Sequence, residues 1–232
     1  MSYFKSRRSA VVARNGSVAT SQPLAAQAGL QILRDGGNAI DAAVATAAVL
    51  NVVEPMSTGI GGDMFALIWD KTERKVVSLN GSGRQAAAAN VADVRKAGYE
   101  SIQNNGEGSQ FAVSVPGTVH GWETALNQYG RMTLREVLKP AIDYALNGFP
   151  VSEVIAHFWS SEDTITKLNH RPSGREMLPG SAKNGGPKYG EIVKLPELGR
   201  TLQAIAEGGS EAFYKGEIAK KTSDFIQKEG GW

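Results

Sequence analysis

The stretch "EPMSTGIGGDMF", residues Glu54–Phe65, places three glycines within four positions, between a helix-like apolar run and a strand-like one. Glycines gathered in this way mark backbone that passes close to another group. That group is a phosphate, neighbouring backbone, or a substrate beside an active site. Phosphate loops run strand, loop, helix, so that the helix N-terminus faces the anion. Here a helix precedes the loop, and neither a Gly-Lys-Ser/Thr nor a G-x-G-x-x-G motif is present. Close backbone packing is the main expectation, and a loop bordering an active site is the alternative.

The residues before this loop predict two helices. Apolar residues recur with a 3.6-residue period over residues 23–34, and "DGG" follows them as a stop signal. Asn38 can cap a second helix, with Asp41 favourably placed in its first turn. The alanine-rich run that follows is apolar on nearly all sides as far as Val53. This pattern predicts a buried, central helix.

The residues after the loop predict a hairpin and further helices. Residues 64–69, "MFALIW", predict a fully buried strand, with residues 75–79, "KVVSL", as its hairpin partner. The remaining sequence predicts a strand at 110–117, a long surface loop at 169–190, and helices at 119–129, 134–147, 196–206 and 215–228. The helix at 134–147 begins with a capping box, "TLRE" at 133–136, and Pro140 is a possible kink within it. The order of helices, hairpin and more helices favours an α+β fold or a layered sandwich over repeated βαβ units.

Composition excludes several function classes. The 232 residues are 41% hydrophobic and 21% charged, as in globular proteins with a buried core. The net charge of +2 comes from scattered residues, so no nucleic-acid partner is expected. The absence of cysteine excludes disulfides, thiolate metal sites and a cysteine nucleophile. The longest apolar run, 39–53, is shorter than the about 20 residues that span a bilayer, and the N-terminus lacks an apolar signal segment. We therefore expect a cytoplasmic protein without membrane contact.

Few residues qualify as site candidates from their pattern alone. His120, His157 and His170 are too widely spaced in the sequence to indicate a metal cluster, and no metal or other cofactor is expected. His120 can border a site, although a structural or exposed histidine is the commoner role. Arg84 follows the second hairpin strand behind a flexible "GSG", where a guanidinium can grip a carboxylate in bidentate fashion. The alternative for Arg84 is a solvated arginine in a turn.

Five segments together resemble the gamma-glutamyltranspeptidase family. They are "GGNAIDAAVATAAVLNVVEP" (36–55), "TGIGGDMF" (58–65), "VPGTVHGW" (115–122), "YGRMTLREVLKPAIDYALNGF" (129–149) and "LPELGRTLQAIAEGGSEAFYKGEIA" (195–219), and they cover most of the chain from about residue 13 onward. The resemblance implies an α+β N-terminal nucleophile hydrolase fold, an αββα sandwich of two sheets covered by helices. Residues 1–232 would then be the N-terminal portion of a large subunit, a single and incomplete domain.

The same resemblance implies the chemistry. Members cleave themselves into a large and a small subunit, and the small subunit begins with a threonine whose hydroxyl attacks the amide of glutathione-like gamma-glutamyl compounds. No threonine here, Thr20 and Thr58 included, matches that cleavage motif, so no catalytic residue is assigned within the chain. The nucleophile is expected beyond Trp232, and a small subunit is the expected partner. The chain alone, as a fragment or a truncated non-catalytic relative, is expected to be inactive.

Arg84 departs from the pattern of better-known family members. Those carry Asp-x-Arg-Glu-x-Ala-Pro at this strand end, and the arginine holds the alpha-carboxylate of the glutamyl group. Here the sequence is "NGSGRQAAAA", with Asn80 in place of the aspartate and Gln85 in place of the glutamate. This form resembles the branch described as gamma-glutamyltransferase-related or cephalosporin acylase-like. Arg84 therefore either binds the carboxylate in a shifted register or has lost that role, and a different amide substrate is the alternative.

Overall fold

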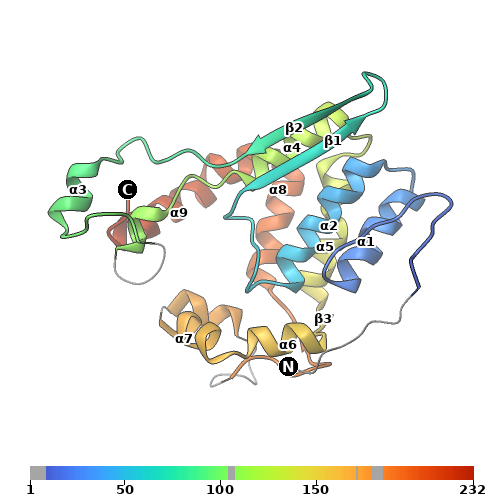
Figure 1. The fold of residues 1–232 in the computed structure, drawn as a ribbon. Helices are drawn as coiled ribbons and strands as arrows, with labels where there is room; N and C mark the ends of the chain where they lie inside the picture. The colour runs from blue at the N-terminus through green and yellow to red at the C-terminus, as the bar shows by residue number, and fades with distance from the viewer. Residues whose placement is uncertain (1–8, 104–107, 171, 179–184) are drawn as a thin grey trace.

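The computed structural model describes residues 9–103, 108–170, 172–178 and 185–232. Its centre is a helical layer with a β-hairpin lying across it (Figure 1). The layer consists of α1 (Pro23–Arg34), α2 (Ala39–Val53), α5 (Leu134–Asn147) and α8 (Pro196–Tyr214). Helix α4 (Thr118–Tyr129) contacts α2, α5 and α8 and also both strands of the hairpin, β1 (Met64–Asp70) and β2 (Lys75–Gly81). The hairpin therefore rests on the helices through α4.

Helix α2 is the buried centre that the sequence predicts. It packs against α1 and α5, and most of its residues are buried. Asn38 and Asp41 form a capping box at its N-terminus. The fully buried Asp41 carboxylate also accepts hydrogen bonds from the backbone N–H groups of Arg131 (3.0 Å) and Met132 (3.1 Å). One carboxylate thus ties the start of α2 to the turn between α4 and α5.

The hairpin is antiparallel and only one of its faces is covered. Its inner face pairs Met64 with Gly81, Ala66 with Leu79 and Ile68 with Val77, and it packs on α4. The other face carries Phe65, Leu67, Trp69 and Val76, whose exposed fractions are 67%, 81%, 62% and 62%; we call these four residues the outer hairpin face. The prediction of a fully buried strand is therefore wrong for this chain, because alternate side chains of a strand point to opposite faces and helices cover only one of them.

Other differences from the sequence predictions lie outside the central layers. The strand expected at 110–117 is a 3₁₀ helix, η1 (Ser109–Ala112), followed by an extended segment outside any sheet. The loop expected at 169–190 begins with the last turn of α7 (Glu162–His170) and continues as η2 (Pro172–Met177); residues 171 and 179–184 lie outside the described part. Elements that the sequence did not predict are α3 (Val91–Lys96), α6 (Glu153–Trp159), α7, β3 (Phe149–Pro150) and β4 (Ile192–Val193).

Of the helices predicted in the second half of the chain, α5 has the predicted bounds, α8 is longer than predicted and α9 begins two residues later. Helix α5 starts with the predicted Thr133–Glu136 capping box and runs through Pro140 without a break. Helix α8 continues to Tyr214 across a kink at Gly209, and α9 covers Glu217–Lys228. Figure 1 shows α3, η1 and α9 forming an arm beside the central layers. Across the described residues, none of the helices is both long and apolar enough to cross a membrane.

Candidate functional site

Three segments that are distant in the sequence meet where the hairpin reaches the start of α4. They are the glycine loop at 59–63, the segment after β2 at 81–84, and the extended segment with the first residue of α4 at 113–118; we call this meeting point the junction. The Gly62 carbonyl accepts hydrogen bonds from the N–H groups of Gly117 (2.9 Å) and Thr118 (3.0 Å). The loop thus caps α4, and two N–H groups that an anion could use are already occupied.

Close backbone contact occurs at the junction, but at other glycines than expected. A β-carbon added to Gly83 would lie 1.7 Å from the Val115 carbonyl oxygen, and one added to Gly117 would lie 1.9 Å from the Gly81 carbonyl oxygen. By contrast, a β-carbon at Gly59 or Gly61 would meet nothing within 4 Å. The expectation of tight packing is therefore wrong for those two loop glycines. It holds instead for glycines of the segments that flank Arg84 and α4.

The backbone around Arg84 is held from two sides. The N–H group of Gly83 donates to the Asp63 carboxylate at 2.8 Å, and the Arg84 carbonyl accepts from the Val115 N–H group at 2.8 Å. The sequence suggested a flexible "GSG" at this point. The structure shows a segment fixed by hydrogen bonds to the glycine loop on one side and to the segment before α4 on the other.

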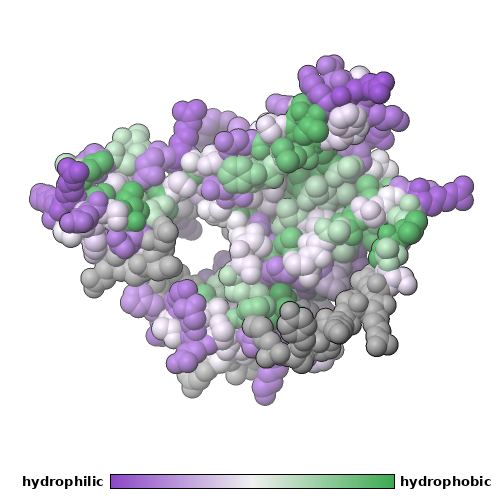
Figure 2. Space-filling view, in the orientation of Figure 1, coloured by the Kyte–Doolittle hydropathy of each residue, from purple (hydrophilic) through white to green (hydrophobic). Residues whose placement is uncertain are grey.

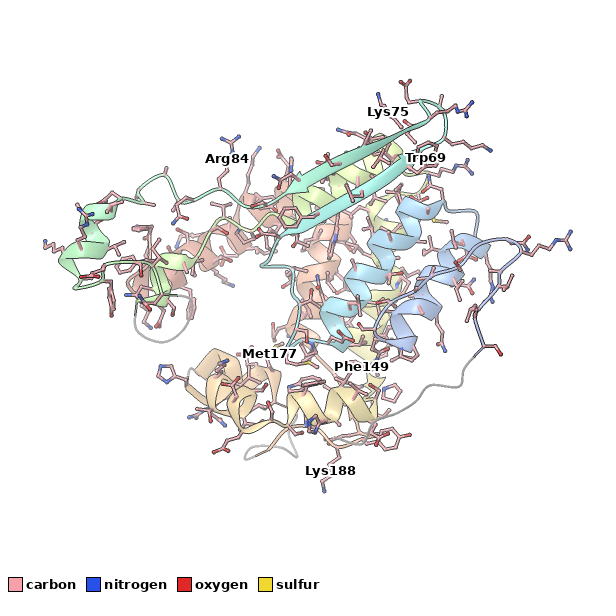
Figure 3. The ribbon with its side chains drawn as sticks, viewed as in Figure 1. Trp69, Lys75, Arg84, Phe149, Met177 and Lys188 are labelled. Carbon is pink, nitrogen blue, oxygen red and sulfur yellow. The ribbon has the colours of Figure 1, made fainter. Side chains whose placement is uncertain are left out.

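The Arg84 side chain itself is free. It is exposed and points away from the helical layer (Figure 3), and no hydrogen bond or ion pair joins its guanidinium to another described residue. Upstream, the Asn80 side chain accepts from the Ser82 N–H group at 2.9 Å and shapes the turn that leads to it. An unpartnered guanidinium on a fixed backbone can bind an anionic ligand without first breaking an internal ion pair. Its role in substrate binding stays a prediction.

Tyr214, the last residue of α8, forms hydrogen bonds to the segment before α4 and to the start of α4. Its hydroxyl donates to the Pro116 carbonyl at 2.7 Å and accepts from the His120 N–H group at 3.1 Å. Burial is the main cause that raises the pKa of the Tyr214 hydroxyl above its ordinary value, which favours the protonated form that donates this hydrogen bond. No local sequence signal marks this residue, because its partners lie 98 and 94 positions away.

The three histidines lie on separate helices. His120 is exposed on α4 with its ring edge-on to Tyr214, at a centroid distance of 6.5 Å. His157 and His170 lie on α6 and α7. Within the described ranges no group of histidine and carboxylate side chains could hold a metal ion.

A largely apolar groove of about 460 Å³ opens beside the junction. Its walls come from the glycine loop, the residues after Arg84, the segment before α4, and the ends of α8 and α9. The lining residues are Gly61, Ala86, Ala87, Val113, Ser114, Val115, Pro116, Phe213, Tyr214, Ala219, Thr222, Ser223, Ile226 and Trp232. Ala86 and Ala87, which line this apolar groove, follow Arg84 in the sequence, and Arg84 itself is not among the lining residues.

Solved structures identify the class of the fold. The crystal structure of cephalosporin acylase from Bacillus halodurans matches with a TM-score of 0.88 and 42% identity, over 100% of this chain and 43% of that chain. Gamma-glutamyltranspeptidase from Helicobacter pylori matches with a TM-score of 0.86 and 30% identity, over 96% of this chain and 63% of that chain. The chain thus has the α+β fold of N-terminal nucleophile hydrolases, as the sequence predicted.

The family follows from the sequence comparison. The sequence model of the gamma-glutamyltranspeptidase family matches residues 25–232, and the chain belongs to this family. The glutathione hydrolase-like YwrD proenzyme of Bacillus subtilis is 41% identical over 224 residues, which are 96% of this chain and 41% of the relative. The glutathione hydrolase proenzyme of the same species is 38% identical over 229 residues, 95% of this chain and 37% of the relative. The chain therefore spans about two fifths of the length of these relatives.

Proposed function

We propose that residues 1–232 form the N-terminal portion of the large subunit of an enzyme that cleaves the amide of glutathione-like gamma-glutamyl compounds. The family membership and the names of the glutathione hydrolase relatives support the reaction class. The observation that carries the role of this chain is Arg84, an exposed guanidinium without a partner among the described residues, on a backbone fixed at the junction. Arg84 binds the alpha-carboxylate of the glutamyl group.

The rest of the mechanism lies in a second polypeptide. A threonine at the N-terminus of the small subunit attacks the amide carbonyl carbon, and its own amine takes the hydroxyl proton. The amide C–N bond then breaks, the leaving amine takes the proton back from the threonine's ammonium group, and the glutamyl group stays on the threonine oxygen as an ester. Water or an acceptor amine attacks this ester, which releases the glutamyl product and restores the threonine hydroxyl. This chain contributes binding: a fixed guanidinium offers two parallel N–H donors to a carboxylate and thereby orients the amide toward the nucleophile.

The exposed apolar residues of the outer hairpin face support the proposal that a partner polypeptide covers this face. Phe65, Leu67, Trp69 and Val76 are all more than half exposed, and Figure 2 shows apolar surface gathered over the hairpin. Continuous apolar surface of this kind marks an interaction site. In an αββα sandwich this face packs on the second sheet, which the small subunit would help to form. The word proenzyme in the relatives' names fits a precursor that yields both subunits.

A second candidate is an acylase for another amide substrate. It is favoured by the 42% identity to the Bacillus halodurans cephalosporin acylase, by the 37% identity to the oxamate amidohydrolase proenzyme of Klebsiella pneumoniae, and by the "NGSGR" sequence around Arg84. Comparing kcat/KM for a gamma-glutamyl anilide with that for an acyl amide lacking the alpha-amino group separates the two candidates.

The Arg84→Ala variant tests the proposal in the protein assembled with its small subunit. We expect kcat/KM for a gamma-glutamyl anilide to fall. The loss should correspond to about 1.5–3 kcal/mol of transition-state stabilisation, the contribution of a hydrogen bond to a charged group. Arg84→Lys should recover part of this loss, because it keeps the charge but not the bidentate fork. Arg95→Ala, at another exposed arginine on α3, serves as the control and should leave kcat/KM unchanged. An unchanged kcat/KM for Arg84→Ala would reject the assignment.

A further inference from the structure

The hydrogen bond between Asp63 and Gly83 links two parts of the junction that lie 20 residues apart. Asp63 is the last residue of the glycine loop, directly before β1, and its carboxylate accepts a hydrogen bond from the N–H group of Gly83 at 2.8 Å. Gly83 directly precedes Arg84. The glycine loop therefore reaches the residue next to the predicted carboxylate-binding arginine through one charged side chain.

This bond completes the fixation of the Arg84 backbone. The carbonyl of Arg84 is held by the N–H group of Val115 at 2.8 Å, and Gly83 lies so close to the Val115 carbonyl that no β-carbon could fit there. The Arg84 α-carbon thus lies between two hydrogen bonds to different segments. Since the backbone direction at an α-carbon sets where its side chain starts, these two bonds determine where the guanidinium can reach.

We propose that Asp63 is a positioning residue for Arg84, an inference that rests on the proposed function. Asp63 holds the backbone before Arg84 through its carboxylate and does not itself contact the substrate. Without this acceptor, the segment 81–83, which contains two glycines, gains conformational freedom that substrate binding must remove. Loss of Asp63 should therefore weaken binding, which raises KM, more than it slows the chemical step.

The contact itself can be tested in the 232-residue chain by NMR. Asp63→Ala removes the acceptor, whereas Asp63→Asn keeps an oxygen that can accept the same bond. We expect the Gly83 amide proton to shift upfield in the alanine variant and to stay near its original position in the asparagine variant. Asp70→Ala is the matched control, because Asp70 accepts backbone N–H groups only within the hairpin turn. A Gly83 amide shift that is the same in the native chain and in Asp63→Ala would overturn the proposal.

Kinetics of the assembled enzyme test the consequence. We expect Asp63→Ala to raise KM by about 5- to 30-fold, the scale of one lost hydrogen bond, with kcat within about twofold. Asp63→Asn should restore most of this loss, and Asp63→Ala should add little in an Arg84→Ala background, since both changes disable the same contact. If Arg84→Ala raises KM while Asp63→Ala does not, the positioning role of Asp63 is refuted and the proposed function stands. If Arg84→Ala itself has no effect, the proposed carboxylate-binding role is refuted.

Discussion

Two glycine-to-alanine substitutions should have opposite effects on stability, although both glycines belong to the junction. Gly117 has backbone angles that alanine tolerates, φ −102° and ψ −17°, so only the contact with the Gly81 carbonyl oxygen opposes a methyl group there. That methyl would start 1.9 Å from the oxygen and would have to move by more than 1 Å to reach 3.0 Å, the shortest contact that β-carbons show. At Gly61 a methyl group meets nothing within 4 Å.

The expected magnitudes follow from these contacts. Overpacking against backbone should cost Gly117→Ala about 1–3 kcal/mol in the free energy of unfolding. Gly61→Ala should instead stabilise by about 0.4–1 kcal/mol, because alanine reduces the conformational freedom of the unfolded chain. The two variants should therefore differ by about 1.4–4 kcal/mol in unfolding free energy.

Urea unfolding of the chain measures this difference. The fluorescence of the tryptophans, including the buried Trp122 of α4, provides the signal, and equal m-values in both variants show that the same surface is exposed on unfolding. The reasoning would be refuted if Gly117→Ala unfolded within 0.5 kcal/mol of the native chain, a change expected at unconstrained surface positions. It would also be refuted if Gly61→Ala were as unstable as Gly117→Ala.

Further predictions concern the two helix caps. Asp41→Ala should lower the free energy of unfolding by about 1–3 kcal/mol, because part-buried backbone N–H groups lose a fully buried acceptor, and Asp41→Asn should cost less; urea midpoints that match the native chain would contradict this. The hydrogen bonds from the backbone and side chain of Thr133 lower the pKa of Glu136. The stability that this cap provides is present above the ordinary pKa of glutamate and is lost as the pH falls through the lowered value. Thr133→Ala should therefore raise the pKa of Glu136 toward its ordinary value, as followed by NMR of the carboxyl carbon; an unchanged pKa would show that the side-chain bond has no effect.

Local signals predicted the helical layer well. The cap residues Asn38 and Thr133 and their acidic partners mark the starts of α2 and α5, because a capping box satisfies backbone groups within four residues. The hairpin also follows from two short apolar runs on either side of a polar turn. Its exposed outer face did not follow, because "MFALIW" is apolar on both faces and the pattern does not say which polypeptide covers each face.

The site could be predicted only in part. The position of Arg84 after a strand end drew attention to it, and its motif added the resemblance to a carboxylate-binding arginine. The contacts that fix it could not be read from local patterns, because Asp63 and Gly83 are 20 residues apart and Tyr214 and Pro116 are 98 apart. The same holds for the glycines, since composition alone does not distinguish Gly61, in open space, from Gly117, in contact with backbone.

The central claim is that this chain binds the substrate while the nucleophile belongs to a second polypeptide. The most direct test incubates the purified 232-residue chain with a chromogenic gamma-glutamyl anilide, after circular dichroism has verified its helical structure. The processed glutathione hydrolase of Bacillus subtilis, run in parallel, shows that the assay detects turnover. We predict no release of the anilide above buffer by the chain alone. Turnover that persists through purification would contradict the account, because it would require a nucleophile within residues 1–232.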